Sequence, residues 1–184
     1  MRVCAVICEY NPFHNGHARH LALAREKSSA DFMLCLMSGA LTQRGAFARH
    51  DKWFRARMAL LGGADLVLEL PCRFACAPAP DFASGGVALL RALNVVTHLS
   101  FGCEAQSLDI LFAARDALRD ESPAFQSVLK DALDRGLPYP RARALAAESA
   151  SGLSGLAEQI ALPNAALALE YLQALPDGIS AVPI

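Results

Sequence analysis

Apolar runs of strand length recur through the first hundred residues, and amphipathic stretches separate them. Four such runs are Val3–Ile7, Asp31–Met37, Asp65–Leu70 and Val95–Phe101. Nearly continuous apolar runs are typical of strands that are covered on both faces of a parallel sheet. The stretches between them predict helices at His20–Arg25, Arg49–Leu61 and Phe82–Leu93. Strands that alternate with helices predict a doubly wound, Rossmann-like α/β domain.

The pattern changes beyond Ala105. Helices are predicted at Leu108–Arg119, Phe125–Arg135, Tyr139–Ala150 and Pro163–Ala174, and no strand signal of comparable strength follows. We therefore expect an α/β domain over residues 1–105 and a helical segment over residues 106–184 that packs on it.

Composition limits the classes of protein that fit. The chain has 184 residues, of which 54% are hydrophobic, so it can bury a core. Its net charge is −1, but residues 1–62 hold nine Lys/Arg against four Asp/Glu, and residues 63–184 hold eight against fourteen. A basic first part suits ATP and RNA, whereas the near-neutral whole argues against indiscriminate nucleic-acid binding.

Neither a secretory signal nor a membrane span is predicted. The first apolar run is broken at Glu9, and no stretch approaches the ~18–20 apolar residues that a span needs. We expect a cytoplasmic protein without a membrane partner. The pair Cys72 and Cys76 lacks the second pair of a metal site, so buried free thiols are expected there.

The segment after the first predicted strand holds the motif His-x-Gly-His, formed by His14, Gly16 and His17. At this spacing both imidazoles project from the first turn of a helix, where free N–H groups and the helix dipole favour an anion. The rings can donate hydrogen bonds to an α-phosphate, and the glycine leaves room for a nucleoside. Two alternatives remain open: a zinc site with His20 as a third ligand, or histidines without chemistry.

Further candidates follow the other predicted strands. Ser38 ends the second run, and Arg44 lies in the loop after it, on the side where open α/β sheets bind ligands. Gly102 directly follows the fourth run and could lie against adenine or ribose. Lys52, Arg55 and Arg57 would give the 49–61 helix a basic surface, either solvated or in contact with triphosphate or tRNA. The chain contains no Gly-x-Gly-x-x-Gly and no Walker A motif, so dinucleotide cofactors and P-loop hydrolysis are disfavoured.

Several blocks occur in an order that resembles one known family. They are Glu9–His17, Met37–Gly39, Gln43–Gly45, Asp51–Trp53, Gly63–Pro71 and Phe101–Glu104. Together they resemble the tRNA(Met) cytidine acetate ligase family, a branch of the HIGH-type nucleotidyltransferases, from Val3 to about Tyr171. The resemblance implies an ATP-dependent ligase that forms acetyl-adenylate and acetylates N4 of the wobble cytidine of elongator tRNA(Met).

The resemblance also implies the site residues. His14 and His17 would be catalytic; Asn11, Arg44 and Asn164 would hold phosphates or acetate, with Ser38 and Lys52 as further phosphate, acetate or tRNA contacts. Mg²⁺ is expected with the polyphosphate. Asn164 could equally cap a helix. The expected ATP-binding residues are Ile7, Cys8, Glu9, Tyr10, Asn11, Pro12, Phe13, His14, Asn15, Gly16, His17, Ala18, Arg19, His20, Gly102 and Asn164.

The sequence departs from the family in two places. Ala40, Leu41 and Thr42 stand where the family has an asparagine-containing segment, so a polar amide is lost. In the family a further segment with an arginine and a Ser/Thr-rich signature follows, so a fragment or a shortened relative is expected. Two alternatives to the ligase therefore stay open: a small-molecule adenylyltransferase, and a nucleotide-binding module without catalysis. The oligomeric state has no sequence signal.

Overall fold

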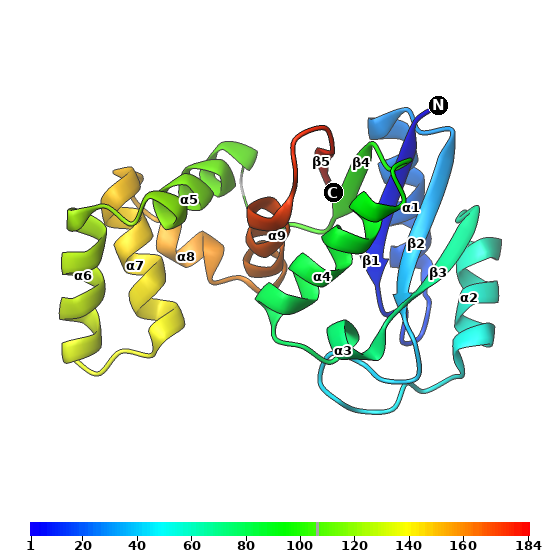
Figure 1. Ribbon diagram of the computed structural model, residues 1–184, viewed down its shortest axis with the longest axis horizontal. Coiled ribbons are helices and arrows are strands. Elements are labelled where there is room, and N and C mark those ends of the chain that lie inside the picture. Colours follow the sequence, from blue (N-terminus) through cyan, green and yellow to red (C-terminus); the bar gives the residue numbers. More distant parts are fainter. Residues whose placement is uncertain (106) are drawn as a thin grey trace. The chain divides into compact units, whose positions relative to one another are not determined.

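A computed structural model describes residues 1–105 and 107–184 of the chain (Figure 1). Two compact units are distinguished, one formed by Met1–Gly102 with Ala174–Ile184 and the other by Cys103–Gln173. Residue 106, where the helical segment was expected to begin, lies outside the described residues.

The first unit is built on a parallel sheet, as predicted. Its strands within the described residues are β1 (Val3–Cys8), β2 (Phe32–Ser38), β3 (Leu66–Leu70), β4 (His98–Phe101) and β5 (Ser180–Pro183), in the order β3-β2-β1-β4-β5. Every residue of β1 is buried, and so is every residue of β2 after Phe32. Because β1 lies at the centre, the turn that leaves its carboxyl end is flanked by the ends of β2 and β4.

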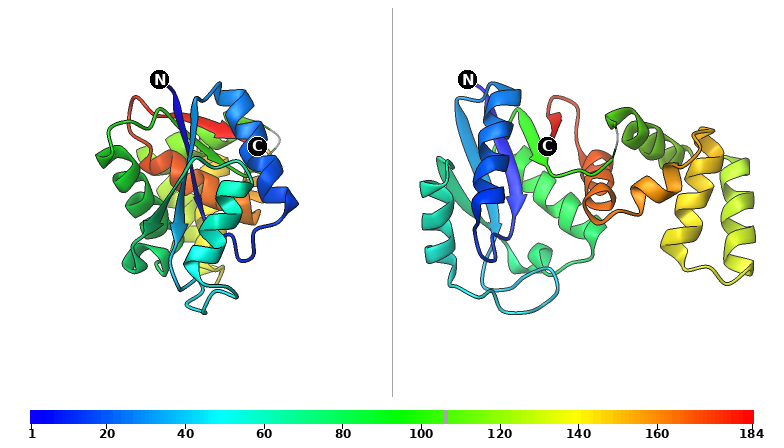
Figure 2. Two further views of the ribbon diagram at one scale, coloured as in Figure 1. Left: turned by 90° about the vertical axis from the view of Figure 1, so that its right-hand side faces the viewer. Right: turned by 180° about the vertical axis from the view of Figure 1, so that it is seen from behind.

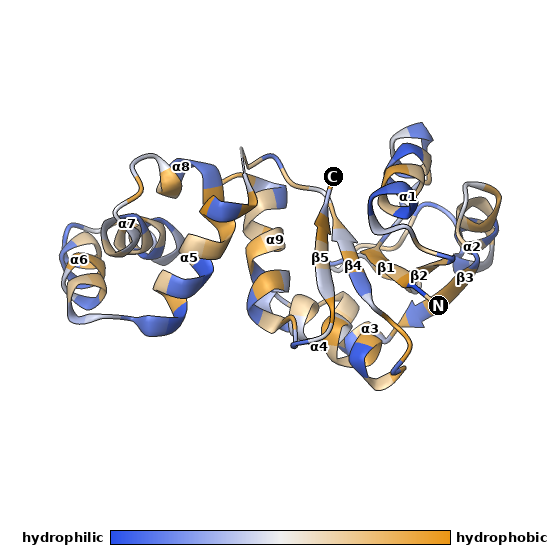
Figure 3. Ribbon diagram, turned by 90° about the horizontal axis from the view of Figure 1, so that it is seen from above, coloured by the Kyte–Doolittle hydropathy of each residue, from blue (hydrophilic) through white to orange (hydrophobic). Residues whose placement is uncertain are grey.

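Helices cover both faces of this sheet (Figures 2 and 3). On one face lie α1 (Asn15–Ser28) and α2 (Lys52–Leu61), and on the other lie α3 (Cys72–Ala75) and α4 (Ala79–Ala92). Gly85 and Gly86 allow α4 to pack closely: added Cβ atoms would meet the ring of Phe74 at 2.2 Å and Ile7 Cδ1 at 2.6 Å, respectively.

The strand β5 corrects the expectation that only helices follow Ala105. It pairs in parallel with β4, from His98 opposite Ser180 to Phe101 opposite Pro183. Its four residues include a proline, and such a short segment carries too little periodicity to be separated from a loop. A proline is tolerated here because β5 is an edge strand.

The second unit is helical. Its helices among the described residues are α5 (Leu108–Asp120), α6 (Pro123–Asp134), α7 (Tyr139–Ser151), α8 (Leu156–Ile160) and α9 (Pro163–Ala174), the last of which ends at the boundary with the first unit. The bounds of the four predicted helices agree within a few residues. The short helix α8 was missed, because five residues are too few to show a helical period.

The cysteines divide into two groups. Cys4, Cys8 and Cys35 are buried free thiols, but Cys72 is exposed and its Sγ lies 3.8 Å from that of Cys76. The expectation of buried thiols at 72 is therefore wrong, because α3 is a short surface helix. Across the described residues, none of the helices is both long and apolar enough to span a membrane.

Candidate nucleotide-binding site

The turn between β1 and α1 is anchored to the core by Tyr10. Its side chain is buried, and its hydroxyl lies 3.5 Å from Cys35 Sγ on β2. The backbone of Tyr10 has a φ of 48°, a left-handed conformation that a bulky residue rarely adopts. Strain of this kind persists only where the surroundings impose it, and it clusters at functional sites. The core thus fixes the path of the chain just before the two histidines.

His14 and His17 form the cap of α1. His14 is the N-cap residue, and its Nδ1 accepts the Gly16 N–H at 3.1 Å. His17 Nδ1 in turn accepts the His14 N–H at 3.3 Å, so the two side chains cap the helix reciprocally. Ser, Thr, Asp and Asn are the usual residues at an N-cap. Two histidines in this arrangement satisfy two free N–H groups while remaining at the helix start.

The cap fixes which nitrogen of each ring carries hydrogen. A Nδ1 that accepts a backbone N–H is unprotonated, so the neutral ring carries its proton on Nε2. Within the described part of the chain, neither Nε2 of His14 or His17 has a hydrogen-bond partner. The rings are stacked with centroids 3.7 Å apart and planes inclined by 21°. The predicted pairing of the imidazoles is therefore confirmed, and both present an N–H donor beside the positive end of α1.

His17 is held neutral. Burial, and after it the nearby rings of His14 and His20, lower the pKa of His17 to about 4. Burial also lowers the pKa of His20, whose Nε2 lies 2.9 Å from Ser100 Oγ on β4. At neutral pH the rings of His17 and His20 therefore act as dipolar hydrogen-bonding groups and not as cations.

Gly16 has a role that the sequence did not reveal. A Cβ at this position would lie 2.9 Å from Cε1 and 3.0 Å from Nδ1 of His14. The glycine therefore allows the His14 ring to fold back over the helix start. Room for a nucleoside, the role predicted for it, stays a prediction.

The loop that follows β2 is tied to this turn by two side chains. Glu9 Oε1 accepts the Gln43 N–H at 2.7 Å, and Asn11 Oδ1 accepts the Arg49 N–H at 2.7 Å. In the same loop Leu41 and Phe47 form an antiparallel bridge, and Arg44 lies exposed at the turn between them. Asn11 is thus engaged with the loop, and Arg44 stays a candidate phosphate contact.

Arg55 corrects the expectation of a basic helix surface. Its side chain is fully buried and donates to the carbonyls of Glu9 (2.5 Å), Ser38 (3.1 Å), His50 (3.1 Å) and Gly39. Burial lowers the pKa of its guanidinium. The residue joins the ends of β1 and β2 to the start of α2, and no sequence pattern separates such an arginine from an exposed one.

Lys52 is also engaged. Its Nζ lies 2.5 Å from Glu69 Oε2, and both side chains are partly exposed. Ser38, another candidate, is buried at the end of β2, and its Oγ has no hydrogen-bond partner among the described residues. These two residues lie beside a pocket at the ends of β2 and β3 and are considered again below.

Other expected ATP-binding residues differ in accessibility. Ile7, Cys8 and Tyr10 have their side chains in the core, so any ligand contact from them would involve the main chain. Pro12, Asn15 and Arg19 are exposed, and Phe13 and Ala18 are half-buried. At Gly102 an added Cβ would meet no described atom within 4 Å, so this position is open.

Asn164 belongs to the second unit. Its Nδ2 donates to Glu104 Oε1 at 2.6 Å, and Glu104 Oε2 accepts the Ala165 N–H at 3.0 Å. The carboxylate that satisfies the start of α9 is therefore that of Glu104, and the suggestion that Asn164 itself caps the helix is wrong. Nucleotide contact by Asn164 stays a prediction.

A zinc site at the three histidines does not fit this geometry. His14 and His17 use Nδ1 for the cap, and His20 Nε2 is bound to Ser100. In residues 1–105 and 107–184 there is no group of three or more His, Cys, Asp or Glu side chains placed to hold a metal ion. Two stacked N–H donors at a helix start suit an anion instead.

Comparison with known proteins agrees with this description. The family described as HIGH Nucleotidyl Transferase matches residues 1–184. The tRNA(Met) cytidine acetate ligase of Clostridium perfringens is 41% identical over 182 residues (95% of this chain and 45% of the relative), and that of Acetivibrio thermocellus is 44% identical over 176 residues (95% and 42%). The chain spans about half the length of these relatives.

Solved structures show the same fold. Thermotoga maritima TmcAL bound with alpha-thio ATP superposes with a TM-score of 0.90 at 35% identity, over 100% of this chain and 47% of that one. The apo form of the same protein gives 0.88, also at 35% identity, over 100% and 45%. With a family match over its whole length and a histidine pair at the start of α1, this chain belongs to the HIGH nucleotidyltransferase family.

Proposed function

We propose that this chain is the nucleotide-binding part of an ATP-dependent tRNA(Met) cytidine acetate ligase. In this reaction acetate and ATP form acetyl-adenylate, and the acetyl group passes to N4 of the wobble cytidine of elongator tRNA(Met). Support comes from the names of the relatives, the alpha-thio ATP in the Thermotoga neighbour and the histidine turn. Because the chain spans about half the length of each relative, the adenylation step is proposed for this chain, and acetyl transfer to the tRNA is proposed for a protein of the relatives' full length.

The stacked rings of His14 and His17 carry this proposal. Adenylation moves negative charge onto the oxygens of the α-phosphate and of the departing pyrophosphate. Two Nε2–H donors fixed by the backbone at a helix start can stabilise that charge without reorganising during the reaction. The site is thus suited to positioning and electrostatic stabilisation of a phosphoryl group.

The expected bond changes are simple. A carboxylate oxygen of acetate attacks the α-phosphorus, an oxygen–phosphorus bond forms, and the bond to pyrophosphate breaks. Mg²⁺, when bound, would neutralise phosphate charge and would be held largely by ATP itself, since it commonly keeps waters and uses few protein ligands. His14 and His17 would donate to the phosphate oxygens, and Arg44 could reach the same polyphosphate from its loop.

Pyrophosphate exchange into ATP tests the proposal. We expect exchange that depends on acetate, and we expect His14→Ala or His17→Ala to reduce it about 10²–10³-fold, as when one preorganised donor is removed elsewhere. His50→Ala, which removes an exposed ring at the start of α2, is the matched control and should not change the rate. Thermal melts check that each variant is folded.

The other outcomes separate the alternatives. Exchange driven by a nucleoside monophosphate, and not by acetate, would identify a small-molecule adenylyltransferase. ATP binding without exchange under either condition would identify a nucleotide-binding module. Full exchange in the His17→Ala variant would refute the assigned role of the histidine turn.

A further inference from the structure

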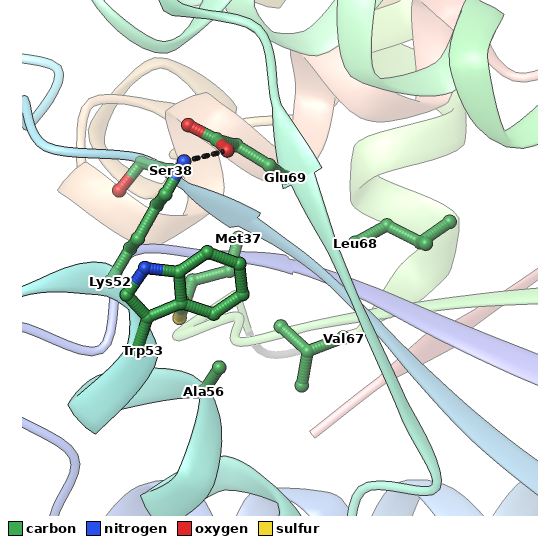
Figure 4. Close-up of a pocket in the computed structure, with 8 residues that line it drawn as sticks. All are labelled: Met37, Ser38, Lys52, Trp53, Ala56, Val67, Leu68 and Glu69. Atoms are coloured by element: carbon green, nitrogen blue, oxygen red, sulfur yellow. Dashed lines mark hydrogen bonds and ion pairs between the residues drawn. The ribbon is translucent and has the colours of Figure 1, made fainter.

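A pocket lies at the carboxyl ends of β2 and β3, at the edge of the sheet opposite to the one that β5 occupies. Its volume is about 220 Å³, and Trp53, Ala56, Val67 and Leu68 are among its lining residues. Figure 4 shows the indole of Trp53 facing β3, with the Lys52–Glu69 ion pair at one end of the pocket. Pockets for drug-sized ligands are usually ~300–1,000 Å³, so this one suits a single small group and not a whole nucleotide.

The charges at the polar end disfavour an anionic ligand, although phosphate or acetate contact by Ser38 and Lys52 stays a prediction. Lys52 Nζ is neutralised by Glu69 at 2.5 Å, and the carboxylate would repel acetate or phosphate. A neutral group that has both donors and acceptors fits better. The carboxylate accepts, the ammonium donates, and the Ser38 hydroxyl has no hydrogen-bond partner within the described ranges.

The apolar walls favour a flat group. The Trp53 side chain is 75% exposed, so a large indole face is open to solvent beside the apolar lining of the pocket. Exposed aromatic rings next to cations are typical of single-stranded nucleic-acid binding, where each base stacks on a ring. Arg57, one helical turn after Trp53 on α2, is exposed and could contact a phosphate of the same strand.

We propose that this pocket binds the acceptor base, an unstacked cytosine of the RNA, with Trp53 stacking on the ring and Glu69 accepting from its N4 amine. This inference rests on the proposed function, which supplies the cytidine. Acidic side chains are the usual partners of the cytosine N4 group, and Lys52 can donate to N3. Neighbouring strands lie ~4.8 Å apart, so the end of β2 places Ser38 next to the turn after β1.

Arg55 joins the two sites. It binds the carbonyl of Glu9, at the start of the histidine turn, and those of Ser38 and Gly39, at the edge of the pocket. At Gly39 an added Cβ would meet Glu69 Oε1, so the carboxylate lies across a position that has no side chain. The proposed base pocket and the histidine turn are therefore parts of one fixed framework in the first unit.

The pocket contains its own reporter, because Trp53 is the only tryptophan of the sequence. We expect cytidine to quench its fluorescence saturably and uridine to bind about tenfold more weakly, since uridine carries an oxygen in place of the N4 amine. Glu69→Gln should remove this preference. Glu26→Gln, at an exposed position on α1, is the matched control and should keep it.

Trp53→Ala gives a second test if Glu69→Gln fails to fold. Its side chain is mostly exposed, so the fold should survive, and cytidine signals in saturation-transfer NMR should be lost. Absence of saturable quenching, or equal quenching by uridine, would overturn the assignment of the pocket. ATP binding to the unaltered chain, measured by calorimetry, separates the two proposals. ATP binding without quenching by cytidine refutes only the assignment of the pocket. Quenching by cytidine without ATP binding refutes only the proposed function.

Discussion

Replacement of Arg55 by alanine should destabilise the first unit strongly. The guanidinium is fully buried and donates to four main-chain carbonyls in three separate segments. A hydrogen bond to a charged group contributes about 1.5–3 kcal/mol, and a buried acceptor left without a donor costs about 1–3 kcal/mol. These effects are not additive, and removal of the guanidinium also removes the cost of desolvating its charge. We therefore expect the free energy of unfolding to decrease by about 3–5 kcal/mol, as when other buried charge contacts are broken.

Two further variants at this helix sharpen the test. Arg55→Lys keeps the charge, but a single ammonium cannot reach Glu9, Ser38 and His50 together, so it should recover only part of the loss. Arg57→Ala, on the exposed side of α2, should change stability by less than about 0.5 kcal/mol.

Urea unfolding followed by Trp53 fluorescence measures the free energy of unfolding of this unit. The probe lies in the first unit, so unfolding of the helical unit does not obscure the result. A loss of less than about 1 kcal/mol in the Arg55→Ala variant, or an equal loss in the Arg57→Ala variant, would refute the assigned structural role of the guanidinium.

Three other outcomes are expected. Gly16→Ala should reduce pyrophosphate exchange at least about tenfold by displacing the His14 ring, while stability changes by less than about 1 kcal/mol because alanine favours the helix. The pKa of His17 is lowered in the folded chain to about 4 from its ordinary 6.5. The contribution of the neutral ring to stability is therefore present above pH 6.5 and is lost as the pH falls toward 4. Urea midpoints should decrease over that range, and His17→Gln should flatten the decrease. Glu104→Ala should lower the stability of the second unit by about 1–2 kcal/mol, because α9 loses the acceptor of the Ala165 N–H. Thermal unfolding of the second unit measures this decrease, and Glu104→Gln should recover part of it.

The strands and most helices of the first unit were predictable because each pattern is local. A buried parallel strand needs an apolar run, and the starts of α1 and α2 carry their own capping groups, such as Asp51 Oδ1, which accepts the Phe54 N–H at 2.9 Å. The His14–His17 pairing was predictable for the same reason. Side chains that are three residues apart on a helix are neighbours, and this does not depend on the rest of the chain.

The missed features depend on contacts between distant residues. The burial of Arg55 comes from the carbonyls of Glu9 and Ser38, which are 46 and 17 residues away along the chain. The strand β5 forms because β4 offers a free edge, and its own four residues carry little signal. The role of Glu104 at α9 likewise spans 61 residues to Ala165. Sequence patterns indicate each element, but they do not indicate which distant parts of the chain will contact one another.

The reciprocal cap at the start of α1 also limits which proton transfers the histidine turn can perform. In their neutral form both rings already carry hydrogen on Nε2, so an incoming proton could add only to Nδ1 and would displace the main-chain hydrogen held there. The turn is therefore poorly suited to act as a general base. A carboxylate nucleophile such as acetate needs none, whereas an amine must lose its proton elsewhere, to a group outside this pair.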